Sequence, residues 1–308
     1  MRPLARCYPR RVAAQLARIR SAVLEWYADA HRDFPWRGTT DPYAVLVSEV
    51  MLQQTQASRV AERFPRFLRR FPTVEALATA SDAEVLAEWS GLGYNRRALA
   101  LRDAASVIAA GGWPMDVDGL ERLPGVGPYT ARAIASLAFG IPVGVVDTNV
   151  RRWLLRRFGG PDDRRRLQAL ADELATRGRG AEVAAWTHAS MELGAALCRA
   201  HAPRCDDCPV ADGCPSRHAP GRVAVPRQAQ LRGSDRAYRG ALLKRLSAAS
   251  RHRMDETVAR KEIASRSDGI GPALDDTGWE RVLAGLERDG LAHRHEGDLR
   301  LGAATIRR

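Results

Sequence analysis

Four of the chain's five cysteines fall in one short stretch near residue 200, and this feature restricts the fold more than any other. They are spaced as Cys198-x6-Cys205-x2-Cys208-x5-Cys214. Four thiolates in one loop can wrap a single compact inorganic centre, and the spacing is not that of a secreted disulfide framework. Thiolates suit either zinc or an iron–sulfur cluster, although a zinc ribbon more usually presents two separate Cys-x2-Cys knuckles. The pattern predicts a metal centre and leaves both alternatives open.

The chain before this loop has helical periodicity, and no alternating strand pattern occurs up to residue 220. Asp41 followed by Pro42 is typical of an N-cap and a first helical position, and Ser81 with Glu84 forms a capping-box pattern. Helices are expected over 12–32, 41–55, a stretch ending near residue 70, 73–80, 81–90, 94–110, 128–139, 147–157, 162–177 and 181–197. This part of the chain is therefore predicted to be all-α.

A glycine hairpin between two helices is predicted over Leu120–Ala131. Proline is favoured in a first helical turn, so Pro128 opens the second helix. Gly125 and Gly127 can adopt positive φ and leave no side chain between the backbone and an approaching phosphate. The N–H groups at the start of the second helix would then form an anion site. An ordinary helical hairpin with glycine at its turn is the alternative.

The last part of the chain reads as a separate module. Residues 219–236 lack periodicity and are rich in Pro, Gly, Gln and Arg, which is typical of a linker. Helices are expected over 237–250, 255–266 and 276–289, and strands over 291–295 and 298–301 with Glu296-Gly297 as their turn. Three helices and a hairpin predict a winged-helix-like α+β module.

The net charge of +12 points to an acidic partner. Nearly all the positive charge is arginine, because lysine occurs only at Lys244 and Lys261. Arginine binds phosphate bidentately, so nucleic acid is a candidate ligand. Codon usage of a GC-rich genome explains arginine over lysine but not the excess over Asp and Glu. No apolar run approaches the ~20 residues that span a bilayer, and no signal peptide is evident, so we expect a cytoplasmic, nucleoid-associated protein without membrane contact.

The hairpin, Asp147 and the cysteine loop, taken in this order, resemble the helix-hairpin-helix base-excision DNA glycosylases over roughly residues 20–218. Within them, four stretches are similar to the adenine glycosylases of the MutY type. These stretches are Phe34–Arg37, Ser48–Thr55, Gly91–Tyr94 and Val146–Val150. The resemblance implies an all-α fold with a six-helix barrel, and a [4Fe–4S] cluster held by the four cysteines in a structural and DNA-docking role.

The resemblance also implies a domain organisation. Residues 1–32 and 147–218 would form the iron–sulfur cluster domain, residues 33–146 the six-helix barrel, and residues 219–236 the linker. Many relatives carry a long Nudix-like C-terminal domain, whereas residues 237–308 are too few and too helical for it. The expected partner is double-stranded DNA with A·8-oxoguanine or A·G mispairs, bound by a monomer.

Three residues match the catalytic positions of the family. Glu49 matches the general acid that protonates adenine at N7, and its apolar helix face is expected to raise its pKa. Asp147 matches the carboxylate that stabilises the oxocarbenium-like sugar, and it could equally cap the next helix. Tyr129 stands where the endonuclease III relatives carry a Schiff-base lysine, which implies base removal without a lyase step. Ordinary structural roles are the alternatives for Glu49 and Tyr129.

The resemblance assigns DNA contacts and a base pocket as well. Gln54 and Tyr94 match residues that wedge into the helix opposite the flipped base, Thr55 matches a neighbour of 8-oxoguanine, and Gly125 and Gly127 would hold the backbone.

Trp36, Arg37 and His188 match the adenine pocket. Two residues depart from the pattern, because Asn95 replaces a second tyrosine and His188 replaces glutamine or glutamate. Protonation of His188 would make base recognition depend on pH.

Two other functions remain open. A thymine mismatch glycosylase would suit Tyr129, although such enzymes generally lack the glutamate that Glu49 supplies. A non-catalytic DNA-binding protein would need neither Glu49 nor Asp147. The sequence therefore favours an adenine glycosylase.

Overall fold

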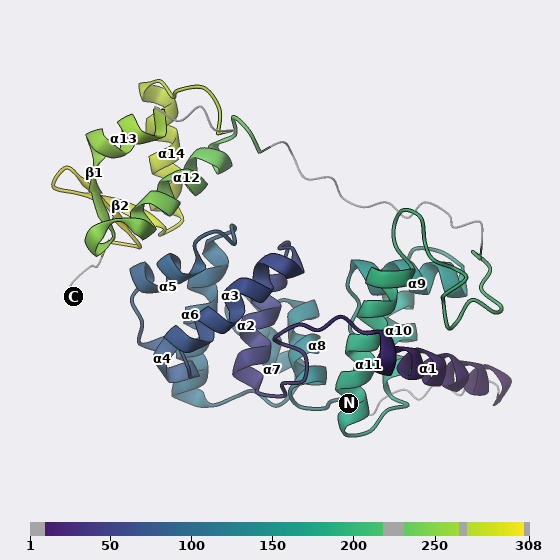
Figure 1. The fold of residues 1–308 in the computed structure, drawn as a ribbon. Coiled ribbons are helices and arrows are strands. Elements are labelled where there is room, and N and C mark those ends of the chain that lie inside the picture. The colour runs from purple at the N-terminus through teal and green to yellow at the C-terminus, as the bar shows by residue number, and fades with distance from the viewer. Residues whose placement is uncertain (1–9, 218–230, 265–269, 305–308) are drawn as a thin grey trace. The chain divides into compact units, whose positions relative to one another are not determined.

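The computed structural model describes residues 10–217, 231–264 and 270–304 (Figure 1). The predicted linker 219–236 lies mostly outside the described residues. The first helices are α1 (Arg10–Ala30), α2 (Pro42–Leu52), α3 (Ala57–Arg70), α4 (Val74–Ala78), α5 (Asp82–Trp89), α6 (Arg96–Gly111), α7 (Val117–Glu121) and α8 (Pro128–Leu137). They are followed by α9 (Thr148–Phe158), α10 (Arg164–Ala175), α11 (Ala181–Glu192) and a π-helical turn, Leu193–Leu197. The all-α prediction for this part is confirmed.

Contacts within the chain define two compact units. The first comprises Met1–Leu46, Met115–Arg122 and Val126–Pro226, and the second comprises Val47–Pro114, Leu123–Gly125 and Arg227–Arg308. The predicted domain boundaries stay a prediction. Each unit is described on its own below.

The first unit is built around an apolar seam between α1, α9, α10 and α11. Leu16, Ile19 and Val23 face this seam because residues spaced by three and four lie on one side of a helix. Trp153 of α9 meets Trp186 of α11 edge to face, with ring centroids 6.4 Å apart. Burial of such side chains contributes about 1.5–3 kcal/mol each. This core supports the ends of α9 and α11, which carry the candidate site residues.

The second unit contains α3 to α6 and the C-terminal module. Phe67, Phe71 and Trp89 form a buried aromatic group between α3 and α5. The predicted capping box is confirmed, because Ser81 Oγ accepts from the Glu84 N–H and the Glu84 carboxylate accepts from the Ser81 N–H. Helix α6 ends at Gly111, and Gly112 follows it at φ 78°.

The C-terminal module has the predicted helices and one strand more than expected. It contains α12 (Asp235–Ala248), a 3-10 turn (Ser250–His252), β1 (Arg253–Asp255), α13 (Glu256–Ala264), α14 (Asp276–Arg288), β2 (Ala292–His295) and β3 (Asp298–Leu301). The antiparallel order is β1-β3-β2, with Met254 opposite Leu299 and Ala292 opposite Leu301. Glu296 and Gly297 both have positive φ, as a two-residue hairpin requires. Strand β1 is too short to show alternation in the sequence.

The glycine hairpin forms, with one correction. Helices α7 and α8 pair across it, and Gly125 has φ 72°. A side chain at Gly125 would place its Cβ 2.7 Å from the Ala100 Cβ. Gly127 has an extended backbone at φ −94°, so it does not use the positive φ expected of it. Its place directly before Pro128 makes it the N-cap of α8 instead.

Candidate functional site

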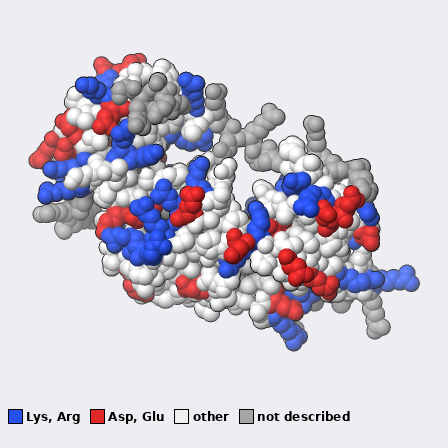
Figure 2. Space-filling model, viewed as in Figure 1, with Lys and Arg blue, Asp and Glu red and all other residues white. Residues whose placement is uncertain are grey.

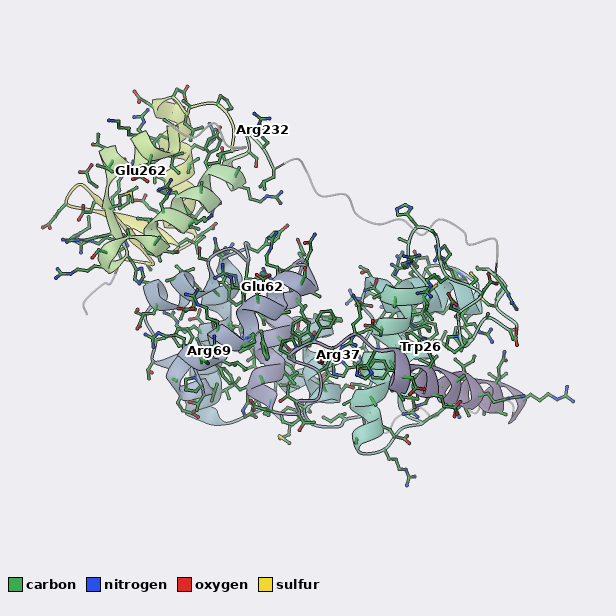
Figure 3. The ribbon with its side chains drawn as sticks, in the orientation of Figure 1. Trp26, Arg37, Glu62, Arg69, Arg232 and Glu262 are labelled. Carbon is green, nitrogen blue, oxygen red and sulfur yellow. The ribbon has the colours of Figure 1, made fainter. Side chains whose placement is uncertain are left out.

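Glu192, at the last position of α11, is the most completely buried carboxylate near the predicted base pocket, with 1% of its surface exposed. Arg32 binds it bidentately, with Nε 2.6 Å from Oε1 and Nη2 3.0 Å from Oε2. Arg37 Nη2 also donates to Oε2, and its side chain, labelled in Figure 3, comes from the loop between α1 and α2. Burial alone would raise the pKa of Glu192, but these guanidinium groups hold it below its usual value.

His188 lies one helical turn before Glu192 on α11. Burial and the nearby charge of Arg37 lower the pKa of His188 to about 4, although Glu192 opposes this shift. The imidazole is therefore neutral at physiological pH. Protonated His188 is disfavoured in this environment. We therefore expect base recognition to depend on pH only under acidic conditions.

Aromatic rings complete this part of the site. Trp36 is buried with 7% exposed, and it stacks on Phe34 with ring centroids 4.8 Å apart. The guanidinium carbon of Arg37 lies 5.3 Å from the Phe34 ring and 5.6 Å from the Tyr27 ring. The structure thus brings Arg37 and His188 together around Glu192, with Trp36 on the same loop as Arg37. Sequence reasoning missed Glu192, whose signal was an acidic residue four positions after His188 in a mostly apolar helix.

Asp147 precedes α9 and serves as its N-cap. One carboxylate oxygen accepts from the Val150 N–H at 2.6 Å, and the other accepts from Asn149 Nδ2 at 2.8 Å. Burial raises the pKa of Asp147, and these two donors oppose the rise. The capping role considered for Asp147 is present, and it fixes the direction in which the carboxylate points.

Tyr129 and Glu49 lie on separate helices of separate units. Tyr129 is half-buried in the first turn of α8, directly after Pro128. Glu49 lies on α2 and has 4% of its surface exposed. Its neighbours Val47, Val50 and Met51 are buried as well, so the apolar surroundings expected for Glu49 are present.

Gln54 and Tyr94 lie in two loops of the second unit. Both have left-handed backbones, with φ 56° at Gln54 and φ 48° at Tyr94. Residues other than glycine rarely adopt this conformation, and it clusters at functional sites. Gln54 is exposed, and Tyr94 has 40% of its surface exposed. Thr55 Oγ1 lies 3.5 Å from the Leu92 carbonyl and brings the two loops together.

The four cysteines line one pocket at the end of α11, together with Arg156 and Arg217. No disulfide joins these four cysteines, and each is half-buried. In the described residues, no group of three or more His, Cys, Asp or Glu is close enough to bind a single metal ion. Four soft thiolate donors around one pocket suit a metal centre, and both zinc and an iron–sulfur cluster take such ligands.

Arginines from α9 brace the cysteine loop, and sequence reasoning missed them. Arg152 Nε donates to the Cys198 carbonyl at 2.7 Å, and Arg156 Nη1 donates to the Arg199 carbonyl at 2.7 Å. Arg157 Nη1 donates to the Gly213 carbonyl at 2.8 Å. All three are buried, with 5–8% of their surface exposed. From the sequence, arginines such as these contribute only to the positive charge. In the structure, their side chains donate hydrogen bonds to buried carbonyls.

The π-helical turn explains where Cys198 is placed. Helix 181–197 was predicted to be continuous, but the α-helical pattern ends at Glu192 and the Cys198 N–H donates to the Leu193 carbonyl at 2.8 Å. A Cβ at Gly194 would lie 2.5 Å from the Asn149 carbonyl oxygen, so the turn packs against the start of α9. The same backbone therefore approaches both Asn149 and the cysteine loop.

Basic side chains are widespread on the surface. Figure 2 shows Lys and Arg (blue) gathered in several groups, with Asp and Glu (red) between them. Among the described residues, no helix is long and apolar enough to cross a bilayer.

Comparison with known proteins places the chain in a family. Residues 47–179 match the HhH-GPD superfamily of base excision DNA repair proteins. The chain is 46% identical over 282 residues to an adenine DNA glycosylase of Mycobacterium tuberculosis (strain CDC 1551 / Oshkosh), covering 88% of this chain and 89% of that protein.

Two solved structures are similar in fold. A thermostable thymine-DNA glycosylase has a TM-score of 0.61 at 29% identity, over 67% of this chain and 98% of that one. Endonuclease III trapped covalently on DNA has a TM-score of 0.57 at 25% identity, over 67% of this chain and 97% of that one.

Proposed function

Because this chain belongs to the adenine DNA glycosylases of the base excision repair superfamily, we propose that it removes adenine mispaired with 8-oxoguanine or guanine in duplex DNA. The observation that carries this proposal is the Arg37–Glu192 pair beside neutral His188. Both oxygens of Glu192 already accept from Arg32 and Arg37, so the pair would act by fixing Arg37 beside His188. The neutral imidazole of His188 can both donate a hydrogen bond to the edge of a base and accept one from it, as the edge of adenine requires.

The proposed chemistry is hydrolysis of the bond between C1′ and N9. Glu49 donates a proton to N7, which makes adenine a better leaving group, and its burial suits a proton donor. The carboxylate of Asp147 stabilises the positive charge of the oxocarbenium-like sugar. Hydrogen bonds from Asn149 Nδ2 and the Val150 N–H hold this carboxylate in place. Water then adds at C1′ and leaves an abasic site. Tyr129 cannot form an imine, so strand cleavage is not part of the reaction.

A second group of residues would contact the DNA strand opposite the flipped adenine. Gln54 and Tyr94 would enter the base stack where adenine leaves it, and Thr55 would lie beside the 8-oxoguanine. The hairpin at Gly125 and Gly127 would bind backbone phosphate through the N–H groups of the first turn of α8. The expectation of a monomer stays a prediction.

A [4Fe–4S] cluster is proposed at Cys198, Cys205, Cys208 and Cys214. Arg152, Arg156 and Arg157 already hold the backbone of this loop, so the cluster would act as a structural crosslink beside basic residues. Iron and sulfide in equal amounts and a visible iron–sulfur absorption band are expected in protein purified without oxygen. One zinc per chain without that band would reject the cluster.

A cleavage assay tests the activity. Duplexes carrying A·8-oxoguanine, A·G, T·G or a normal A·T pair are incubated with the protein, and half of each sample is then treated with alkali. We expect strand breaks only after alkali and only at adenine opposite 8-oxoguanine or guanine. Breaks before alkali would contradict the assignment of Tyr129.

The two alternative functions give different patterns in the same assay. Thymine excision from T·G, with the adenine duplexes intact, would identify a thymine mismatch glycosylase, the activity named for one of the similar structures. Binding to all four duplexes without any excision would identify a non-catalytic DNA-binding protein.

A further inference from the structure

Arg97, near the start of α6, connects the loop of Gln54 to the loop of Tyr94. Its Nη1 donates to the carbonyls of Val50 (2.7 Å), Met51 (3.2 Å) and Gln53 (2.5 Å). Its Nη2 donates to Thr55 Oγ1 (3.1 Å) and to the carbonyls of Gly93 (3.0 Å) and Leu92 (3.5 Å), and its Nε donates to the Tyr94 carbonyl (3.4 Å). One side chain therefore contacts both segments, although the first lies 42 to 47 positions before Arg97 in the chain.

The contacts on the first segment cap a helix. Val50 and Met51 belong to the last turn of α2, where carbonyl oxygens lack a partner within the helix. A positive charge is favoured at this end of the helix dipole, and the rigid fork of a guanidinium can serve several acceptors at once. Burial lowers the pKa of Arg97 to about 10, so it keeps its charge at neutral pH.

The contacts on the second segment hold an unusual backbone. The guanidinium carbon of Arg97 lies 5.4 Å from the ring of Tyr94 and 5.4 Å from the ring of Trp89. Trp89 Nε1 donates to the Gly93 carbonyl at 3.1 Å, so the loop is held from two sides. Left-handed residues such as Gln54 and Tyr94 persist only where the surroundings determine their conformation.

We propose that Arg97 is a positioning residue that holds Gln54 and Tyr94 in the conformation that enters the base stack, and that it ties this conformation to the helix carrying Glu49. The proposal rests on the proposed function where DNA is concerned. In the DNA-free protein it makes a separate claim, namely that Arg97 keeps the two loops together. A lysine at this position keeps the charge but cannot serve both segments, because it lacks the planar fork.

The substitution R97K tests the proposal, and R96K is its matched control, because Arg96 is the neighbouring arginine with a 75% exposed side chain. Hydrogen exchange of DNA-free R97K is expected to be about tenfold faster in residues 91–95, with α4 unchanged. A second measurement uses duplex DNA with the fluorescent base 2-aminopurine beside the 8-oxoguanine. Its fluorescence rises when neighbouring bases unstack, so at saturating protein the rise should be smaller with R97K than with wild type. Single-turnover excision should slow by about 10²-fold, as expected for misplaced groups. R96K should behave as wild type in each measurement.

The possible outcomes separate this proposal from the proposed function. Wild-type exchange, fluorescence and excision in a folded R97K protein would overturn the role of Arg97. Absence of adenine excision by the wild-type protein would instead reject the proposed function, while the exchange result would still decide whether Arg97 holds the loops.

If R97K does not fold, T55V and T55S replace it. T55V removes one acceptor of Arg97 and T55S keeps it, so only T55V should show faster exchange in residues 91–95 of the DNA-free protein. Unchanged exchange in T55V would overturn the proposal.

Discussion

His188 shows how the surroundings of one side chain decide its chemistry. The ring is enclosed on α11 near the charged Arg37, and its pKa falls to about 4. A neutral imidazole can both donate and accept a hydrogen bond, whereas the protonated form only donates. The charge needed in this part of the site is supplied by Arg32, Arg37 and Glu192, which form a closed ion-pair group.

His188 should make folding stability depend on pH. In the unfolded chain a histidine titrates near pH 6.5, so between about 6.5 and 4 the unfolded state binds more protons than the folded state. The free energy of unfolding therefore falls as the pH drops through this window. The glutamine of H188Q cannot titrate in this range. Between neutral pH and pH about 4, the free energy of unfolding should therefore fall by up to about 3 kcal/mol more in wild type than in H188Q. Urea unfolding at both pH values measures this difference, and equal losses in the two proteins would contradict it.

Glu49 should be required for excision and not for binding. E49Q keeps the size of the side chain and removes the acidic proton, so single-turnover excision of adenine should fall about 10²- to 10⁴-fold. Affinity for the A·8-oxoguanine duplex should stay near that of wild type. E62Q is the matched control, because Glu62 is exposed on α3 and is labelled in Figure 3. Excision by E49Q at the rate of E62Q would remove Glu49 from the role of acid.

At the scale of single elements, the hairpin and the π-helical turn each solve a packing problem. Gly125 lets the chain reverse where Ala100 leaves no room for a side chain. Gly194 lets the π-helical turn approach the carbonyl of Asn149, and the widened turn ends at Cys198. In both places a glycine permits a close approach between segments, and a candidate site residue, Tyr129 or Cys198, follows four positions later.

The two glycines of the hairpin should differ in their tolerance of alanine. G125A combines a positive φ with a Cβ 2.7 Å from the Ala100 Cβ, so we expect a loss of about 1–3 kcal/mol in the free energy of unfolding. G127A has an extended backbone, and its Cβ would meet no heavy atom within 4 Å. Its stability should stay within about 0.5 kcal/mol of wild type. Denaturant unfolding of both variants measures the contrast, and similar losses would show that the conformation of Gly125 does not matter.

At the scale of the whole molecule, charge governs encounter with DNA more than the chemical step. The net charge of +12 is spread over many arginines, several of which are taken up by internal carbonyls and carboxylates. The arginines that remain at the surface can neutralise phosphates and release counterions. Binding should therefore respond strongly to salt.

A salt titration checks this property. Raising the salt concentration from about 50 to 200 mM should weaken binding to undamaged duplex by about 10³-fold. At saturating protein the single-turnover excision rate of adenine should change little, because the reacting groups are inside the protein and screened less. An affinity that does not change with salt would contradict the proposed phosphate contacts.

The sequence by itself determined the helices, their caps and the C-terminal hairpin, because these depend on periodicity and on residues close together in the chain. Ser81–Glu84 and the Glu296-Gly297 turn are local patterns of this kind, and each has the predicted conformation. The cysteine loop was equally readable, since its spacing is a local property. Strand β1 was missed because its formation depends on pairing with β3, more than forty positions away.

Only the tertiary structure decided which polar groups meet. Arg32 and Arg37 reach Glu192 across more than 150 positions, and Arg97 reaches Gln53 across 44. Sequence patterns carry no signal for such contacts, because an arginine that binds buried carbonyls has the same local context as one in solvent. The protonation state of His188 also depends on the tertiary structure. Burial sets it together with the guanidinium of Arg37, which is far from His188 in the sequence. Residue type indicates which protonation states and hydrogen bonds a side chain can have. Packing decides which of them it has in the folded protein.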